Sequence, residues 1–331
     1  MIKFLLPLAW IYDGVTRLRN WLFDVGVLPS REYTTPIICI GNLSVGGTGK
    51  TPHTEWLVRH FLERGKYIAV LSRGYGRESK GFLWVTPDKC ALEVGDEPLQ
   101  IRRKFTDKNL VCAVSENRCK GIDNILAAHP QTEVILLDDA FQHRFVKANH
   151  YILLTDYHKL YVNDYVLPAG RLREHIKGAQ RAQTVIVTKC PPQLSQEERQ
   201  KIAAALKLQY GQNLFFTTIS YAEIPLEKEP LLITGIAHPE SLLNYLSEKG
   251  ITPKHLHFPD HHNFTEKDIQ LIIERAQQHR SILTTEKDFM RLESQNLPKD
   301  IVERIQVISI APKFLFGETE HFIQTLQNYV R

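Results

Sequence analysis

Residues 36–54 read PIICIGNLSVGGTGKTPHT, an apolar run that leads into a glycine-rich turn ending in Gly-Lys-Thr. The apolar run predicts a buried strand, and a helix is expected from Lys50 to about residue 64. The glycines let backbone N–H groups turn toward phosphate oxygens, and the positive end of the helix favours an anion. The order of strand, turn and helix therefore predicts a phosphate-binding loop.

The side chains of this loop carry its chemistry. Lys50 offers a positive charge to the β- and γ-phosphates of a nucleotide, and Thr51 offers a hydroxyl to Mg²⁺. Pro52 falls in the first helical turn, where its missing N–H costs nothing. Ser44 departs from the general pattern G-x-x-x-x-G-K-[ST], which has glycine there. The predicted nucleotide-binding residues are Ser44, Val45, Gly46, Gly47, Thr48, Gly49, Lys50 and Thr51.

Apolar runs alternate with helical stretches along the rest of the chain, and the runs lie at 67–72, 110–114, 133–138, 151–155, 184–188 and 214–219. This alternation predicts an α/β fold with a doubly wound, mostly parallel sheet, like that of phosphate-loop nucleotidases. The polar segment 221–230 contains two prolines and is interpreted as a linker. The alternation then resumes, which predicts a second, smaller α/β domain. The expected divisions are an N-terminal helix at 1–28, a phosphate-loop domain at 29–222 and the smaller domain at 223–331.

Two aspartates follow the apolar run in VILLDDAFQHR (134–144). An aspartate at the end of a neighbouring strand is the usual second Mg²⁺ contact of phosphate-loop enzymes. Asp138 is therefore predicted in the metal shell, with Asp139 sharing it or orienting a neighbour. A solvated surface turn is the alternative. Gln142, which follows closely, is a candidate for contact with phosphate or substrate.

A group that accepts a proton is expected if the chain transfers phosphate to a hydroxyl. Asp96 and Glu97 lie in VGDEP (94–98), and FPDHHNF (258–264) of the second domain contains Asp260, His261 and His262. An Asp–His pair across the domain cleft is the functional interpretation. A helix-capping aspartate and surface histidines are the alternative. A zinc site is a third interpretation, although the spacing fits no familiar zinc pattern. Its candidate ligands are His255, His257, His261 and His262.

Arginines occur in two loops that follow strands, LSRGYGR (71–77) and LPAGRLRE (167–174). Loops at the carboxyl ends of parallel strands form the ligand-binding edge of an open α/β sheet. Guanidinium groups can grip phosphate with two hydrogen bonds. The candidates for this role, with solvated surface side chains as the alternative, are Arg73, Arg77, Arg171 and Arg173.

The first 25 residues carry an apolar stripe at helical spacing, formed by Phe4, Leu8, Ile11, Val15, Leu18, Leu22 and Val25. The segment MIKFLLPLAWIY is too short to span a bilayer. Such a stripe usually packs against a core. Trp10, Trp21 and the neighbouring arginines would also suit the surface of a membrane.

Composition sets outer limits on function. The chain has 331 residues, a net charge of +4, 43% hydrophobic residues and five cysteines without a Cys-x-x-Cys pair. This charge is small for a nucleic-acid-binding protein, so no nucleic-acid partner is expected. Scattered cysteines in odd number indicate reduced thiols in the cytosol.

Seven motifs in series resemble those of the tetraacyldisaccharide 4′-kinase family, and the similarity covers nearly the whole chain. The motifs are GNLSVGGTGKTP, LSRGYGR, VGDEP, LLDDAFQHR, LPAGRLRE, DHHNF and TEKD. The resemblance implies transfer of the γ-phosphate of ATP to the 4′-hydroxyl of a tetraacylated glucosamine disaccharide 1-phosphate, which gives lipid IVA. It also implies peripheral contact of the N-terminal helix with the cytoplasmic face of the inner membrane.

The resemblance implies individual roles as well. Lys50 and Thr51 match the phosphate and Mg²⁺ ligands, and the family loop itself lacks the first glycine. Asp96 matches the proposed catalytic base, with His261 as its partner. Asp138 and Asp139 match the acidic pair at the metal. Arg171 lies in a motif that faces the substrate in the family, and Lys189 is an implied contact to the adenine. Arg73 and Gln142, which are candidates from their positions in the chain, are predicted to contact the substrate together with Arg171.

Two other functional classes stay open at this point. Similar loops occur in ATPase or GTPase switches that act on protein partners, although NKxD, the guanine signature, is not found in the sequence. A kinase for a soluble sugar or cofactor is the second class.

Overall fold

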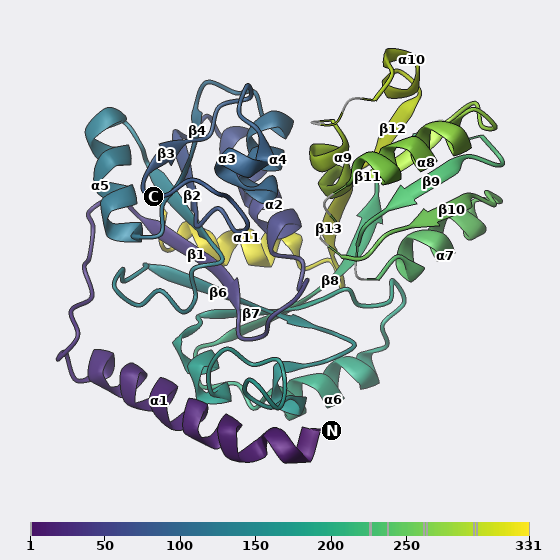
Figure 1. The fold of residues 1–331 in the computed structure, drawn as a ribbon. Helices are drawn as coiled ribbons and strands as arrows, with labels where there is room; N and C mark the ends of the chain where they lie inside the picture. Colours follow the sequence, from purple (N-terminus) through teal and green to yellow (C-terminus); the bar gives the residue numbers. More distant parts are fainter. Residues whose placement is uncertain are drawn as a thin grey trace.

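The computed structural model describes residues 2–224, 227–236, 238–260, 262, 264–293, 295 and 297–330. Two sheets organise the chain (Figure 1). The larger has nine strands in the order β13-β8-β7-β6-β1-β5-β2-β4-β3, and the smaller has four in the order β10-β9-β11-β12. The expected α/β class with a mostly parallel sheet is confirmed.

The large sheet is parallel except at its two edges, where β3 and β13 run antiparallel to their neighbours. Its strands are β1 (Ile37–Asn42), β2 (Ile68–Ser72), β3 (Leu83–Trp84), β4 (Leu110–Val114), β5 (Val134–Asp138), β6 (His150–Asp156), β7 (Thr184–Thr188), β8 (Asn213–Tyr221) and β13 (Ile310–Phe314). Every interior strand matches a run expected from the sequence. The two edge strands were not anticipated, and Pro312 in β13 is tolerated because edge strands need fewer ladder bonds.

Helices cover both faces of the large sheet. The helices of this unit are α1 (Leu6–Asp24), α2 (Lys50–Leu62), α3 (Ala91–Val94), α4 (Asp96–Lys104), α5 (Arg118–Ala128), α6 (Gln196–Leu206) and α11 (Thr319–Gln327), with 3-10 turns η1 (Ile2–Leu5), η2 (Tyr161–Asn163) and η3 (Ile176–Arg181). Alternate residues of β1 face opposite ways. Ile38 and Ile40 pack with α2, α4 and α11, whereas Ile37 and Cys39 pack with α5.

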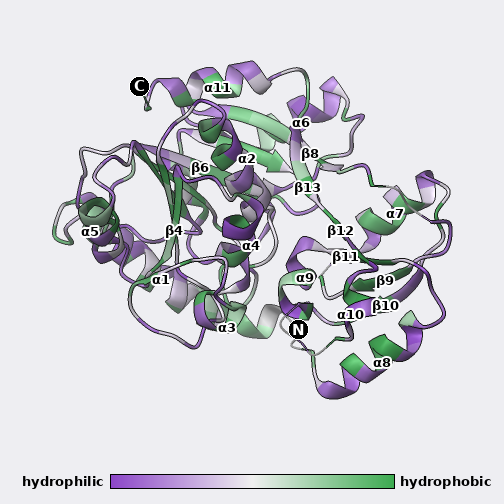
Figure 2. Ribbon diagram, turned by 90° about the horizontal axis from the view of Figure 1, so that it is seen from above, coloured by the Kyte–Doolittle hydropathy of each residue, from purple (hydrophilic) through white to green (hydrophobic). Residues whose placement is uncertain are grey.

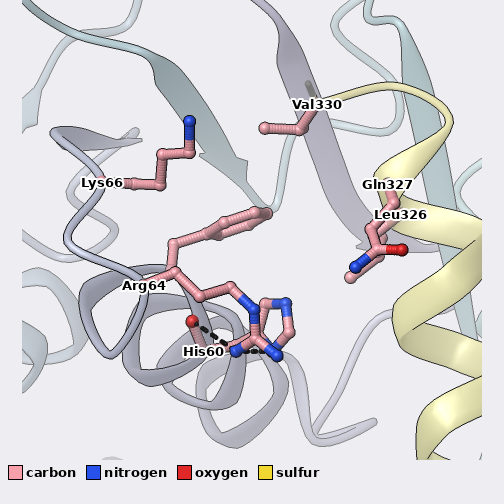
Figure 3. Close-up of a pocket in the computed structure, with 7 residues that line it drawn as sticks. His60, Arg64, Lys66, Leu326, Gln327 and Val330 are labelled. Carbon is pink, nitrogen blue, oxygen red and sulfur yellow. Dashed lines mark hydrogen bonds between the residues drawn. The ribbon is translucent and has the colours of Figure 1, made fainter.

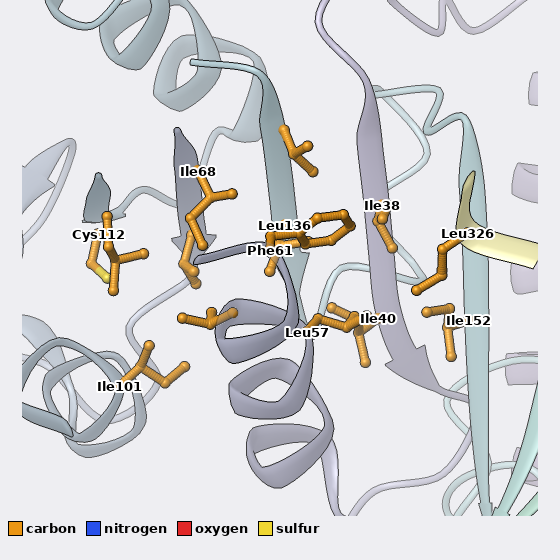
Figure 4. Close-up of a cluster of buried hydrophobic side chains, with 14 of the residues drawn as sticks. Ile38, Ile40, Leu57, Phe61, Ile68, Ile101, Cys112, Leu136, Ile152 and Leu326 are labelled. Carbon is orange, nitrogen blue, oxygen red and sulfur yellow. The ribbon is translucent and has the colours of Figure 1, made fainter. Parts of the chain in front are cut away.

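Helix α2 is anchored by the apolar cluster beneath it. Leu57 and Phe61 face the strands, and Ile40 of β1 and Leu136 of β5 lie against them (Figure 4). Leu57 is fully buried, and burial of such a side chain contributes about 1.5–3 kcal/mol. Because the glycine-rich turn leads directly into α2, this packing fixes the position of the turn against the sheet.

The smaller unit repeats the layered design. Its elements are β9 (Leu231–Thr234), α7 (Glu240–Glu248), β10 (Lys254–His257), α8 (Glu266–Ala276), β11 (Ile282–Thr285), α9 (Glu286–Leu292), α10 (Lys299–Val302) and β12 (Ile305–Ile308). Figure 2 shows hydrophobic residues concentrated in strands such as β4 and β9, with the helices polar on one side. Each of the two sheets therefore has a core of its own.

The end of the chain differs from the expected division. Residues after β12 return to the large sheet, where β13 pairs with β8 and α11 packs on the core of the first unit. Phe314 stacks on Phe322 of α11, which explains this return. The smaller unit is thus inserted between β8 and β13, so the chain after β12 lies on the large sheet and not, as expected, in the smaller unit. The remaining divisions stay predictions.

Candidate functional site

The glycine-rich turn lies between β1 and α2. Gly46 and Gly49 have φ of 106° and 83°, a left-handed backbone that glycine adopts without steric cost. Neighbouring side chains brace the turn. The Asn42 amide donates to the Thr48 hydroxyl over 2.7 Å, and the Thr188 hydroxyl at the end of β7 donates to the Thr48 carbonyl over 2.9 Å. The turn is therefore held from two strands of the large sheet, β1 and β7, which lie on either side of β6.

Ser44 belongs to a second brace. It forms an isolated bridge with Leu172, and the Val45 N–H donates to the Arg171 carbonyl over 2.7 Å. The Arg173 N–H closes the pair by donating to the Leu43 carbonyl over 2.7 Å. Ser44 is buried and its φ is not positive, so no glycine is needed at this position. The loop 167–174 thus holds the first half of the phosphate loop.

Asp138 ends β5 beside the turn and pairs in register with Ile40 of β1. Its side chain is buried and accepts hydrogen bonds from the Thr54 hydroxyl over 2.9 Å and from the Ser72 hydroxyl over 3.3 Å. Burial raises the pKa of Asp138 to about 7, and the charges of Glu97 and Asp139 act in the same direction. The charged form of this buried carboxyl group is therefore disfavoured.

Asp139 has a different environment, although it is the next residue. Its φ is 46°, and its side chain contacts Lys50 and Arg173. The Lys50 ammonium lies 3.7 Å away, and the Arg173 guanidinium donates over 2.9 and 3.1 Å. Burial opposes ionisation, but these two cations outweigh it and lower the pKa of Asp139. One carboxyl group is therefore held charged beside another whose charge is disfavoured.

Asp96 is the first residue of α4, which lies beside α2. Glu55 of α2 accepts hydrogen bonds from Gln100 over 2.7 Å and from Lys104 over 2.6 Å. Arg59, one turn later in α2, stacks on Phe105 just after α4. The two helices therefore run in the same direction, and both begin at the ligand edge of the sheet.

The carboxylate of Asp96 has defined partners. Its Oδ1 accepts from the Glu97 N–H over 3.0 Å, and its Oδ2 accepts from Arg291 of α9 over 2.5 Å. The turn before it is tight, because Gly95 packs against Gly74 of the LSRGYGR loop. His261, the predicted partner of Asp96, lies outside the described residues.

The other predicted side chains lie around the same edge. Gln142 donates to the Asn42 carbonyl over 2.8 Å, and Arg171 pairs with Asp164 over 3.2 Å. Lys189 follows β7 and pairs with Asp156 over 2.9 Å, while Arg73 is exposed. Gln142 therefore adjoins the phosphate loop through its side chain, and Arg171 through its carbonyl, which accepts the Val45 N–H.

Two predicted interpretations are not supported by these contacts. Arg77 pairs with Glu116 and donates to the Gly81 carbonyl, so it holds the loop together. His255 bonds Thr234, and His262 bonds Asp268. Within the described ranges, no three His, Cys, Asp or Glu side chains gather to hold a metal on their own.

Sequence reasoning missed several groups in this region. The hydroxyl groups of Thr54 and Ser72 hold Asp138, Glu97 lies near enough to act on its charge, and Arg291 reaches Asp96 from the other unit. Threonine at 54 lies on the same face of α2 as Lys50, which the helical period could have indicated. Nothing in the sequence pattern links Arg291 to Asp96.

A cavity of about 300 Å³ lies elsewhere, between the C-terminal end of α2 and α11 (Figure 3). Arg64 folds over His60 there and donates to its ring and carbonyl. Leu326, Gln327 and Val330 form the opposite wall. No predicted site residue lines this cavity, and it is at the far end of α2 from the phosphate loop.

Helix α1 docks on the site by its polar side. The Tyr12 hydroxyl donates to the Arg173 carbonyl over 2.8 Å, and Asn20 donates to Glu174 over 2.6 Å. Arg19 donates to the Gln142 carbonyl over 3.2 Å, so α1 touches the loops that flank the phosphate loop. Figure 1 shows α1 lying along one border of the molecule.

The apolar side of α1 faces outward, contrary to a core-packed stripe. Its exposed side chains are Phe4, Leu8, Trp10, Ile11, Val15, Leu18, Trp21 and Val25. Phe4 is 91% exposed and Trp10 is 70% exposed. Across the described chain, none of the helices combines the length and apolar character needed to cross a bilayer.

Comparisons with known proteins agree with one another. The family model described as LpxK, tetraacyldisaccharide-1-P 4′-kinase, matches residues 1–331. The tetraacyldisaccharide 4′-kinase of Phocaeicola vulgatus is 43% identical, over 99% of this chain and 95% of its own length. That of Bacteroides thetaiotaomicron is 44% identical, over 99% and 93%. A crystal structure of LpxK from Aquifex aeolicus in complex with ATP is similar with a TM-score of 0.76 and 28% identity, covering 100% of this chain and 99% of that one.

Proposed function

The chain belongs to the tetraacyldisaccharide 4′-kinase family, and from this premise we propose how its residues carry out the family reaction. The reaction moves the γ-phosphate of ATP to the 4′-hydroxyl of a tetraacyldisaccharide 1-phosphate, giving lipid IVA in lipid A biosynthesis. The observation that carries the assignment is the phosphate loop, with Lys50 against Asp139, in a chain that matches the family over its full length.

Lys50 and the loop amides are the proposed ATP site. Backbone N–H groups of residues 44–51 and the positive end of α2 suit an anion. Lys50 is largely buried, so its charge acts with little screening by water. Asp139 is its resting partner, and we propose that the β- and γ-phosphates take over this contact. Lys189, at the same edge, is the proposed contact to the adenine.

Mg²⁺ fits the oxygen atoms available here. Thr51, Asp138 and Asp139 are the residues that would hold it, and they supply a hydroxyl and two carboxylates. Mg²⁺ usually takes one or two carboxylates together with substrate phosphates, which agrees with a site that lacks a complete protein cage among the described residues. When bound, Mg²⁺ neutralises charge on the phosphate oxygens. The buried carboxyl of Asp138, with its raised pKa, is the expected group to ionise on binding.

Asp96 is the proposed base for the 4′-hydroxyl, with His261 as its predicted partner. Helices α2 and α4 begin at the same edge, so Asp96 is on the side of the sheet where the terminal phosphate would lie. Asp96 orients the hydroxyl and accepts its proton as oxygen attacks phosphorus in line. Positioning and electrostatics supply most of the rate in such transfers, and a general base about 10²–10⁴-fold.

Three polar side chains are the proposed contacts to the disaccharide. The Gln142 side chain donates to the Asn42 carbonyl before the phosphate loop, the Arg171 carbonyl accepts the Val45 N–H of the loop, and Arg73 is exposed. A substrate held by these groups lies between the loops that α1 also contacts.

The outward face of α1 is the proposed membrane contact. Its polar side is already occupied by the protein, so the exposed Trp and Leu side chains are unpartnered in water. Interfacial helices bury such a face at the boundary of headgroups and acyl chains. We place the protein peripherally on the cytoplasmic face of the inner membrane, where an acylated substrate is accessible.

The test incubates the purified protein with γ-labelled ATP, Mg²⁺ and the lipid disaccharide in detergent. Label is expected in the lipid, and ADP release is expected to depend on the lipid. ADP release that is indifferent to lipid, without labelled lipid, would instead indicate a hydrolytic switch. Label on a soluble sugar but not on the lipid would indicate a different kinase.

A further inference from the structure

The TEKD motif at 285–288 has no role in the reaction described so far. It opens α9, where the Thr285 hydroxyl accepts the Asp288 N–H over 3.2 Å and donates to Asp288 Oδ2 over 2.8 Å. Asp288 is completely buried and also accepts the Gly235 N–H, at the end of β9, over 2.9 Å. Oδ2 of Asp288 is therefore fixed to the ends of two strands of the small sheet, β9 and β11.

Arg291 lies one turn further along α9 and connects this carboxylate to the large unit. Its Nη1 is 3.5 Å from Asp288 Oδ1, and its Nη2 is 2.5 Å from Asp96 Oδ2. The Arg291 side chain is 9% exposed and that of Asp96 is 11% exposed. The Arg291 guanidinium contacts the Asp288 carboxylate and is largely out of water. It can therefore hold the Asp96 carboxylate in a narrow range of orientations.

Each carboxylate oxygen atom of Asp96 consequently accepts a hydrogen bond. Oδ1 accepts the Glu97 N–H of its own helix, and Oδ2 accepts Arg291. These bonds set the plane of the carboxylate. A carboxylate has about four lone-pair sites, so accepting these bonds is compatible with receiving a proton from a hydroxyl.

We propose that Arg291, held by Asp288, is a positioning residue that aims the carboxylate of Asp96 at the acceptor hydroxyl. The inference rests on the proposed function, in which Asp96 is the base. It assigns the unassigned TEKD motif to the acceptor side of the reaction, and it makes catalysis depend on a contact between the two units.

Other ion pairs already join α4 and α9 along the same seam. Arg291 is therefore not needed merely to hold the two helices together. Lys104 of α4 pairs with Glu286 over 2.6 Å, and Arg103 pairs with Glu293. Arg103 lies two helical turns away from Asp96 along α4. It offers a control, because its replacement removes a cation and an ion pair from the same seam, together with hydrogen bonds to the Pro87 and Lys89 carbonyls, without touching Asp96.

The test is a double-mutant cycle on the full-length enzyme with labelled ATP and the lipid disaccharide. Arg291→Met is expected to lower kcat by about 10–10²-fold, since misplacement of a reacting group by about 1 Å can cost 10²-fold. The KM for ATP is expected to stay within about twofold, because nucleotide contacts lie on the other unit. Arg291→Lys is expected to recover part of kcat, since lysine restores the charge but not the fork. Arg103→Met is expected to leave kcat within about twofold, as for most exposed pairs.

The decisive arm is Arg291→Met in an Asp96→Asn background, measured by single turnover. If Arg291 acts through Asp96, its replacement has little further effect there. Equal losses in the two backgrounds would overturn the positioning role, and so would a fall in melting temperature without a change in kcat. Wild-type turnover in Asp96→Asn alone would instead refute the base assignment, so the two failures are distinguishable.

Discussion

The phosphate loop and the α4–α9 seam are built in contrasting ways. The loop, Asp138 and Asp139 follow the neighbouring strands β1 and β5, and each is held by residues of the same unit. At the seam, Asp96 meets Arg291, a residue 195 positions away in the chain and in the other unit. The nucleotide side of the reaction is thus rigid within one unit, whereas the acceptor side depends on how two units meet.

Replacing the acceptor base gives the largest expected effect. Asp96→Asn is expected to lower kcat by about 10²–10⁴-fold, since a general base typically contributes that much. ATP affinity should persist, because Asp96 is at the α4–α9 seam and does not belong to the phosphate loop. Steady-state kinetics and nucleotide titration measure both. Asp123→Asn, which weakens a surface pair with Arg31, is the control. Loss of ATP binding in Asp96→Asn would show that the two regions are not separable.

Removing the lysine of the loop tests the opposite region. Lys50→Ala is expected to lower kcat/KM by about 10²–10³-fold, the usual range for losing a group that stabilises developing charge. It should also weaken ATP binding, because Lys50 is proposed to contact phosphate before and during transfer. Lys201→Ala, on the exposed face of α6, is the matched control. Unchanged affinity together with unchanged turnover would mean that the loop has been misread.

The outward face of α1 gives the next effect. Trp10→Ser is expected to reduce binding to vesicles of anionic lipid by about tenfold or more, since burying a large apolar side chain contributes about 1.5–3 kcal/mol. Turnover on a short-chain soluble substrate should not change. Tyr210→Ser removes another exposed aromatic, 107% exposed and distant in the chain from α1, and should leave vesicle binding intact. Equal binding by the two variants would argue against membrane contact through α1.

The smallest effect concerns the stability of the nucleotide side. Because burial raises the pKa of Asp138 to about 7, the folded state holds a proton that the unfolded state has lost above about pH 4. Stability from this group is present at low pH and is lost as pH rises toward 7. Asp138→Asn keeps two hydrogen-bonding atoms without the charge. Without nucleotide or Mg²⁺, it should therefore melt higher than the wild type at pH 8.

The melting temperature should rise by about 2–4 °C for each kcal/mol by which the free energy of unfolding increases. The difference between variant and wild type should vanish near pH 4. Thermal denaturation at several pH values measures this. An unchanged or lower melting temperature at pH 8 would mean that the Asp138 charge is compensated in the fold. Activity should fall in the same variant, which would identify Asp138 as a site where function costs stability.

The two regions also differ in how much of their structure could be predicted from the sequence. The phosphate loop is continuous in the chain, and Asp138 follows four apolar residues of a buried strand, so both could be predicted. Ser44 could not be understood in advance, because its bridge to Leu172 involves a loop more than a hundred residues later.

Features that depend on distant partners were beyond local patterns. The apolar stripe of α1 fits a core or a membrane equally well, and only the contacts of Tyr12 and Asn20 show which side faces the protein. β13 carries a proline and pairs with β8 far upstream, so its return to the large sheet was missed. The Asp96–Arg291 contact has no periodic signal at all.

We propose that the phosphate loop and the α4–α9 seam meet at the terminal phosphate of ATP. The direct measurement is a crystal structure with a non-hydrolysable ATP analogue and the lipid disaccharide. We expect the terminal phosphate about 3 Å from Lys50 Nζ, with the 4′-hydroxyl between this phosphate and Asp96. A nucleotide bound away from the glycine turn, or an acceptor hydroxyl that faces away from Asp96, would contradict it.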